Sequence, residues 1–148
     1  MDGEFMSIQF EWRGNSDEPE RESLWARDVS GGRYKIQSVP FFVYDISYGD
    51  VVLAERDENA LVFARVVARG GHSTYRVFLS SDIAMSRFLQ KWEVIEHYGC
   101  SYERASDRLL AIDVHPQADV LDVYRELESG ERDGLWEFEE GHCGHSTR

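Results

Sequence analysis

The sequence has few cysteines and no long apolar segment. Its two cysteines, Cys100 and Cys143, lie far apart in the 148 residues, which does not suit the disulfide framework of a small secreted domain. No apolar run reaches the roughly 18 residues of a membrane-spanning helix, and no segment has the pattern of a signal peptide. Internal repeats and low-complexity segments are also absent. We therefore expect a cytoplasmic protein with no attachment to a membrane.

Positive charge is also scarce. The chain has 16 basic against 28 acidic residues, a net charge of −12. Binding to nucleic acid depends on lysines and arginines that displace counterions from phosphates, and an anionic membrane repels an acidic protein. The composition therefore argues against both kinds of partner. The acidic excess either serves solubility alone or steers the protein towards a basic partner.

The first half of the chain has the pattern of a small β-barrel. The central stretch 38–55 (SVPFFVYDISYGDVVLAE) combines an aromatic run, a Gly-Asp turn and a buried strand. Short alternating segments with turn residues between them surround it, and Leu24 and Trp25 are the expected anchors of one. We expect a barrel over residues 6–70, and we expect residues 1–5 to be a tag remnant. The expected strands are 7–12, 23–29, 33–39, a strand from Val51, and 60–68.

The period changes after Arg69-Gly70-Gly71, which marks the expected boundary. Residues 83–98 and 120–130 have apolar side chains at spacings of three and four, as amphipathic helices do, with Gly99 as the end of the first. Short strands flank both helices. The order strand, helix, strand, strand, helix, strand over 71–141 predicts a ferredoxin-like (βαββαβ) half and an α+β chain. We expect residues 142–148 to form a flexible tail.

No motif in the sequence predicts catalysis, a metal site or a cofactor. His72 stands beside Ser73 and Thr74, but neighbouring residues of a strand point to opposite faces, so we interpret this segment as a domain junction. The tail HCGH (142–145) has metal-binding residue types without a second cluster at matching spacing. Carboxylate pairs are unavoidable among 28 acidic residues. We expect a protein that is not an enzyme.

Acidic residues concentrate in the last third of the chain. Residues 111–140 hold ten carboxylates and two arginines. In the last strand Trp136 and Phe138 should face the helices, which leaves Glu137 and Glu139 on the other face of the sheet. These carboxylates either form a solvated rim or meet a basic protein. The partner-binding residues that we predict are Asp119, Asp122, Glu126, Asp133, Glu137, Glu139 and Glu140.

Four ordered segments resemble a known family: 22–26 (ESLWA), 39–42 (VPFF), 47–52 (SYGDVV) and 71–74 (GHST). That family consists of small bacterial proteins, frequent in actinobacteria and myxobacteria, and is catalogued only as a domain of unknown function. The resemblance implies a free-standing cytoplasmic protein and carries over no catalytic residue. Small acidic bacterial proteins of this kind are often immunity proteins, an analogy of size and charge.

The sequence therefore leaves two main hypotheses; a third, a regulatory adaptor that binds a host enzyme, is not separated from the first by the sequence. In the first, the chain is an immunity protein that binds a cognate toxin domain and blocks its active site with an acidic surface, because toxins that act on nucleic acid or translation have basic clefts. In the second, it binds a small ligand or catalyses a reaction in a pocket between its two halves. The residues that we predict for that pocket are Tyr44, Tyr48, Asp50 and His72.

Overall fold

The computed structural model describes residues 4–14 and 17–146. In these residues the chain is mostly strand, with two helices. None of the described helices is long and apolar enough to cross a membrane. The elements are β1 (Phe5–Arg13), β2 (Pro19–Asp28), β3 (Arg33–Ile36), β4 (Val51–Asp57), β5 (Ala60–Ala68), β6 (Ser73–Leu79), α1 (Asp82–His97), β7 (Cys100–Arg104), β8 (Leu109–Val114), α2 (Val120–Arg132) and β9 (Trp136–His142).

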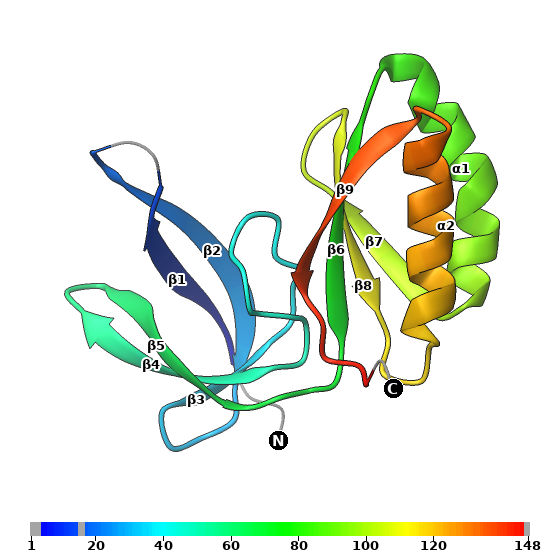
Figure 1. The fold of residues 1–148 in the computed structure, drawn as a ribbon. Coiled ribbons are helices and arrows are strands. Elements are labelled where there is room, and N and C mark those ends of the chain that lie inside the picture. The colour runs from blue at the N-terminus through cyan, green and yellow to red at the C-terminus, as the bar shows by residue number, and fades with distance from the viewer. Residues whose placement is uncertain (1–3, 15–16, 147–148) are drawn as a thin grey trace.

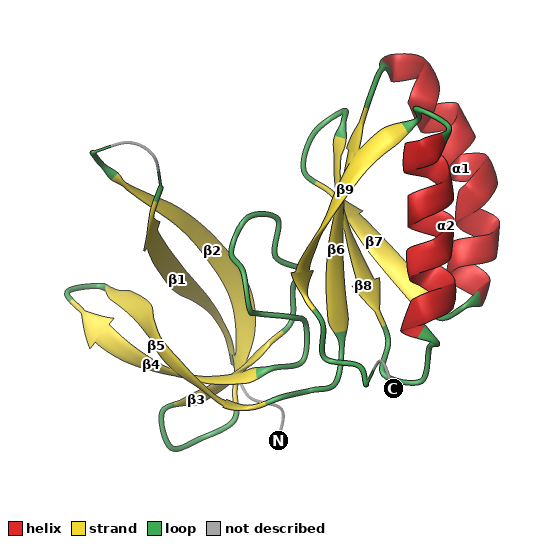
Figure 2. Ribbon diagram, viewed as in Figure 1, coloured by secondary structure: helices red, strands yellow, loops and turns green. Residues whose placement is uncertain are grey.

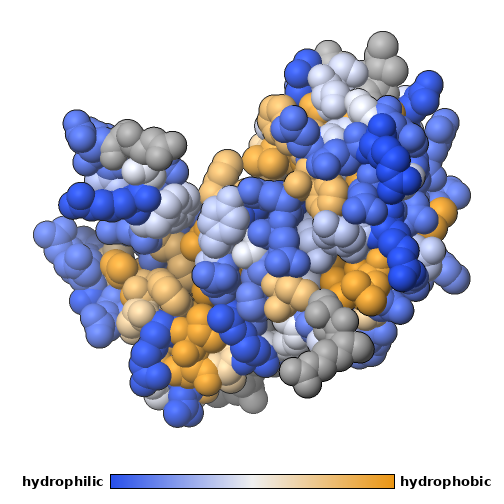
Figure 3. Space-filling model, in the orientation of Figure 1, coloured by the Kyte–Doolittle hydropathy of each residue, from blue (hydrophilic) through white to orange (hydrophobic). Residues whose placement is uncertain are grey.

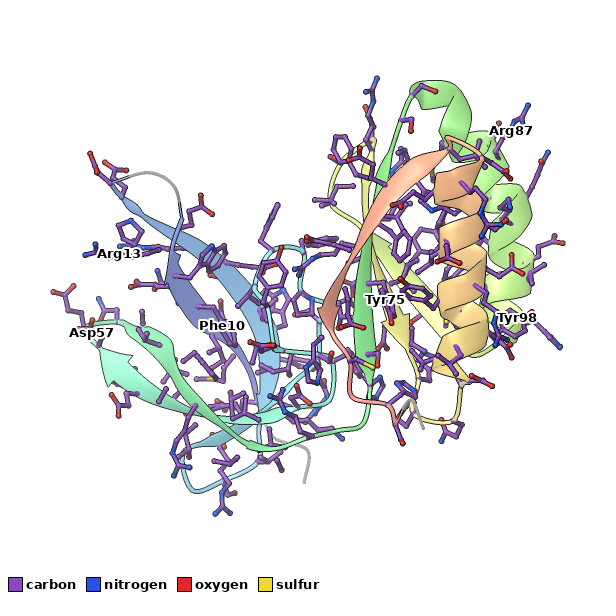
Figure 4. All side chains as sticks on the ribbon, viewed as in Figure 1. Phe10, Arg13, Asp57, Tyr75, Arg87 and Tyr98 are labelled. Carbon is purple, nitrogen blue, oxygen red and sulfur yellow. The ribbon has the colours of Figure 1, made fainter. Side chains whose placement is uncertain are left out.

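The first half is a ring of strands in the order β1-β2-β3-β4-β5 (Figure 1). Successive strands pair antiparallel, and a short parallel pairing at Ile8–Leu61 joins β1 to β5 and closes the ring. Alternate side chains such as Ile8 and Phe10 are buried in the interior, as the period of two requires. Phe10 is labelled in Figure 4. For the same reason Leu24 and Trp25 cannot both point inwards. Leu24 is buried and Trp25 is 59% exposed, so the prediction of Trp25 as an anchor is wrong.

The second half is an antiparallel sheet in the order β7-β8-β6-β9, with both helices on one face (Figure 2). β6 is the first of these strands along the chain, and it follows β5 after residues 69–72. Its side chains Tyr75, Val77 and Leu79 join the core under the helices. α1 ends as predicted, because Tyr98 is its C-cap and Gly99 follows at φ 104°.

α2 does not end at Ser129-Gly130 but continues to Arg132. Gly130 is a packing residue, because a Cβ placed there would overlap the indole ring of Trp136. The turn that follows is made at Gly134, whose φ is 76°. The glycine that the sequence suggests as a helix end therefore lies inside the helix, where it leaves room for β9.

Replacement of Gly130 by alanine should destabilise the protein even though alanine is the better helix former. The helix propensity gained is about 1 kcal/mol, whereas overpacking of a core typically costs about 1–3 kcal/mol, or more where a ring must move. We expect a net loss of unfolding free energy, measured by urea denaturation followed by circular dichroism. Ser129→Ala, one position away on the same helix, serves as the control. A Gly130→Ala protein more stable than the native one would contradict this packing role.

Candidate functional site

The face of the second sheet that carries no helix is turned towards the first half (Figure 2). Its residues follow from the alternation of each strand and from the register, since residues paired across strands share a face. We call this surface the helix-free face. Its residues are Thr74, Arg76 and Phe78 of β6, Ser101 and Glu103 of β7, Leu109, Ala111 and Asp113 of β8, and Glu137 and Glu139 of β9.

The connecting loop, residues 37–50, covers the middle of this face. The hydroxyls of Ser47 and Thr74 are hydrogen-bonded at 2.7 Å, with both side chains fully buried. Arg76, which is 2% exposed, donates from Nη1 to the carbonyl of Val43 at 2.8 Å. These contacts fix the loop to β6. A hollow lies on either side of the connecting loop.

Two carboxylates hold the connecting loop in shape. Glu22 accepts hydrogen bonds from three successive backbone amides, those of Phe41, Phe42 and Val43, at 2.7, 3.1 and 2.9 Å. Asp50 lies at the other end of the loop, and its side chain is 1% exposed. Its carboxylate accepts hydrogen bonds from the backbone of Ser47 and Gly70 and from Nη1 of Arg69.

The first hollow is an apolar groove of about 420 Å³. It opens where Figure 3 shows a notch between the two halves, with hydrophobic residues at its edge. Phe42 and Phe78, on opposite sides of the groove, are 52% and 51% exposed. Glu137 is the cross-strand partner of Phe78, so the two side chains are neighbours on the sheet. We call this hollow the aromatic groove; Phe41, Arg76, Leu109, Phe138 and Glu139 complete its lining.

Glu139 is already neutralised by the protein itself. It accepts from Nε of Arg76 at 3.0 Å and from the hydroxyl of Tyr44 at 2.6 Å. The hydrogen bond to Glu139 is the main cause of the raised pKa of Tyr44, whose ring also lies 4.6 Å from the Arg76 guanidinium carbon. Glu137 makes no ion pair within the described part of the chain, so it is the groove carboxylate that remains available.

The second hollow, of about 560 Å³, lies beside β7 and β8; we call it the histidine cavity. His72 and His115 share the Asp113 carboxylate: His72 Nδ1 is 2.8 Å from Oδ1, and His115 Nε2 is 3.5 Å from Oδ2. Burial raises the pKa of Asp113, and the hydrogen bond from His72 opposes this increase. The lining residues of the histidine cavity are Val39, Tyr48, His72, Ser101, Tyr102, Glu103, Asp113, His115, Pro116 and Gln117.

The structure separates the carboxylates that we predicted as one partner-binding surface. Glu137 and Glu139 lie on the helix-free face, whereas Glu140 accepts from the hydroxyl of Tyr75 at 3.1 Å, on the helix side. The others belong to α2 and its ends, where each position faces a different environment. Asp119 is the N-cap of α2 and Asp133 is its C-cap. The Asp122 carboxylate lies 3.2 Å from Nη1 of Arg125, and the Asp133 carboxylate lies 3.8 Å from Nζ of Lys91. Glu126 is half-buried.

The residues predicted for the alternative pocket are also divided. Tyr48 and His72 line the histidine cavity, with ring centroids 5.3 Å apart. Tyr44 lies against Arg76 instead, and the side chain of Asp50, the last residue of the connecting loop, is buried. Asp113 and His115 also line the histidine cavity and were not predicted for this pocket. A charged residue inside the apolar strand 109–114 was the available signal for Asp113.

The described part of the predicted tail contacts the rest of the protein. His142 belongs to β9, and His145 lies 2.6 Å from the Ser73 hydroxyl and 2.8 Å from the carbonyl of His115. Both cysteines are unpaired. Burial raises the pKa of the Cys100 thiol to about 12. Within residues 4–14 and 17–146 no three histidine, cysteine or acidic side chains are placed to hold a metal ion.

A search of curated proteins finds no match to this sequence. Among solved structures, the chain is similar to a hypothetical protein from Neisseria gonorrhoeae with a TM-score of 0.78 and 17% identity. The similarity covers 95% of this chain and 96% of that protein. At this identity the likeness shows a shared fold. The family model described as Domain of unknown function (DUF4265) matches residues 22–138, most of the sequence, and the chain therefore belongs to that family.

Proposed function

We propose that this chain is an immunity protein that binds a cognate toxin domain and blocks its active site through the aromatic groove. The observation that supports this proposal best is the exposure of Phe42 and Phe78 at an open groove beside an available carboxylate, Glu137. Large exposed aromatic residues with an acidic neighbour are typical anchors of a protein interface. The proposal assigns no catalytic step to the chain.

Charge determines the kind of partner that fits. The net charge of −12 attracts a basic surface over a distance and raises the rate of encounter. In the groove, a lysine or arginine of the partner would lie against the ring of Phe78 and pair with Glu137, which combines a cation–π contact with an ion pair. The basic cleft of an enzyme that acts on nucleic acid offers such side chains. In this arrangement the carboxylates of α2 attract the basic toxin over a distance but do not contact it.

The proposal also includes the finer descriptions of fold and location. We place the protein in the cytoplasm, because its unpaired cysteines suit a reducing compartment. We regard the ring of the first half as a small β-barrel, supported by its closure between β1 and β5. We regard the second half as a ferredoxin-like unit, supported by the strand order β7-β8-β6-β9 and the helices on one face.

Phe78→Ala should weaken binding to the toxin by more than about tenfold, since an anchor in a desolvated interface contributes about 2 kcal/mol or more. The probe is the protein encoded immediately upstream of this gene, purified as a catalytically inactive variant and titrated by calorimetry. Glu137→Gln should slow association and reduce its dependence on salt. A second measurement is the growth of cells that express the active toxin together with the native chain or one of these variants.

The matched controls lie on α1, away from the groove. Leu89→Ala removes an exposed apolar residue, and Glu93→Gln removes an exposed charge. Both controls should bind as the native chain does. Equal losses in the groove variants and the controls would refute the aromatic groove as the contact, and an upstream protein that neither binds nor harms cells would refute the immunity role.

A further inference from the structure

The histidine cavity has a wall whose hydrogen-bonding character is fixed. Asp113 is 3% exposed, and its carboxylate can only accept hydrogen bonds. Because Oδ1 lies 2.8 Å from Nδ1 of His72, the ring proton of neutral His72 is held on Nδ1. The other ring nitrogen, Nε2, then presents a lone pair. It is an acceptor with no hydrogen-bond partner among the described residues, in a side chain that lines the cavity.

The position of His72 is fixed as well. A Cβ added to Gly49 would lie 3.0 Å from Cδ2 and 3.2 Å from Nε2 of His72, so a side chain at this position would cover Nε2 and the glycine leaves it uncovered. The Tyr48 ring lies 5.3 Å from it and the His115 ring 5.9 Å. An imidazole held by a buried carboxylate and flanked by two aromatic rings loses little entropy when its free nitrogen accepts a further hydrogen bond.

The other polar groups of the cavity also favour a donor. Glu103 adds an exposed carboxylate on β7, two positions from Ser101, whose hydroxyl lies 3.2 Å from Nε2 of His115. With neutral histidines, Asp113 and Glu103 make the wall negative in a chain of net charge −12. An anionic ligand would be repelled by such a wall. A cationic group is attracted to it, and the ring of Tyr48 offers a face against which an alkylammonium can pack.

We propose that the histidine cavity binds a small organic cation, a primary amine or a guanidinium group, which donates one N–H to Nε2 of His72 and lies against the carboxylate of Glu103. The volume of about 560 Å³ is in the range of small-molecule sites. This site is separate from the aromatic groove, since Phe78 and Glu137 line only the latter. It therefore does not depend on the immunity role.

The test uses the full chain with 1,4-diaminobutane and arginine amide as probes and 1,4-butanediol as their neutral counterpart. Binding is measured by calorimetry and by backbone amide shifts in NMR spectra. We expect both cations to shift the amides of Tyr48, Ser101, Glu103 and Gln117, and the diol to shift none of them. Glu103→Gln should weaken both cations about tenfold, since it removes a charge-assisted hydrogen bond. Glu93→Gln, an equal change of charge on α1, should not.

A tripeptide with a central lysine and blocked ends distinguishes the source of the cation. Tighter binding of this peptide than of the diamine assigns the site to a side chain of a protein partner, and the reverse order assigns it to a free amine. Shifts that map elsewhere, binding that the Glu103→Gln protein retains in full, or equal binding of the diol would each overturn the proposal.

Discussion

Asp50→Ala should lower the free energy of unfolding by about 2–4 kcal/mol, because it removes a charged acceptor shared by two backbone amides and a guanidinium. The Asp50 carboxylate is 1% exposed and accepts from the guanidinium of Arg69 at 2.9 Å. It also accepts from the backbone amides of Ser47 and Gly70, at 2.9 and 3.0 Å. Alanine would leave the buried amide of Ser47, the part-buried amide of Gly70 and the Arg69 guanidinium, which is 44% exposed, without their acceptor. The buried amide carries the largest desolvation cost.

The position of Asp50 makes this loss larger than that of an ordinary hydrogen-bonded group. The residue joins the end of the connecting loop to the segment that leads into β6, so it holds the two halves together. Gly70 lies directly against the backbone of Gly49, with no room for a Cβ. We therefore expect Asp50→Ala to shift the unfolding transition to lower urea concentration, because the residues between the two halves cannot rearrange to make up for the lost contacts.

Urea denaturation, followed by tryptophan fluorescence and by circular dichroism, measures the effect. Asp50→Asn keeps the shape and one acceptor oxygen but turns an amide donor towards other donors, so it should lie between alanine and the native protein. Asp57→Ala is the control, because Asp57 is exposed at the end of β4 (Figure 4) and should change stability by less than about 0.5 kcal/mol. An Asp50→Ala protein as stable as this control would contradict the role of Asp50.

Local patterns predicted much of the architecture. The turn residues and short alternating segments predicted a first half made only of strands, and spacings of three and four predicted both helices. The inward faces were predicted less well: Leu89 of α1 and Leu121 and Tyr124 of α2 fit those spacings but are exposed. Trp136 and Phe138 pack under the helices, and Glu137 and Glu139 face away, because a strand alternates strictly. The resemblance to a family of unknown function is confirmed by the match over residues 22–138.

The candidate sites could not be predicted in the same way, because they depend on contacts between distant residues. Asp113 and His72 are 41 positions apart, and the amides that Glu22 holds are 19 to 21 positions away. No local period predicts such pairs. The acidic surface was predicted from neighbourhood in sequence alone, whereas a helix and a strand distribute neighbouring carboxylates over different faces. Arg76 then neutralises Glu139 from another strand, which only the register reveals.

Trp136→Ala should be the most damaging change in the second half, at about 3–5 kcal/mol of unfolding free energy. The indole is 1% exposed, and its ring centroid lies 5.7 Å from that of Phe88, edge to face. Its Nε1 donates to the carbonyl of Leu127 at 2.9 Å, which joins β9 to α2. Alanine removes this hydrogen bond and leaves a cavity beneath both helices. Trp25→Ala, at an exposed tryptophan, should cost about 0.5 kcal/mol or less.

A double-mutant cycle with Gly130→Ala separates packing from helix propensity. If Gly130 is glycine only because the indole occupies the space of its Cβ, the methyl group of Gly130→Ala should be harmless once Trp136 is alanine. Gly130→Ala should then stabilise the Trp136→Ala protein, by up to about 1 kcal/mol of regained helix propensity, although it destabilises the native chain. The coupling energy between neighbours is expected to exceed about 1 kcal/mol. Additive effects would show that Gly130 and Trp136 act independently, and the helix would then owe its internal glycine to something other than this contact.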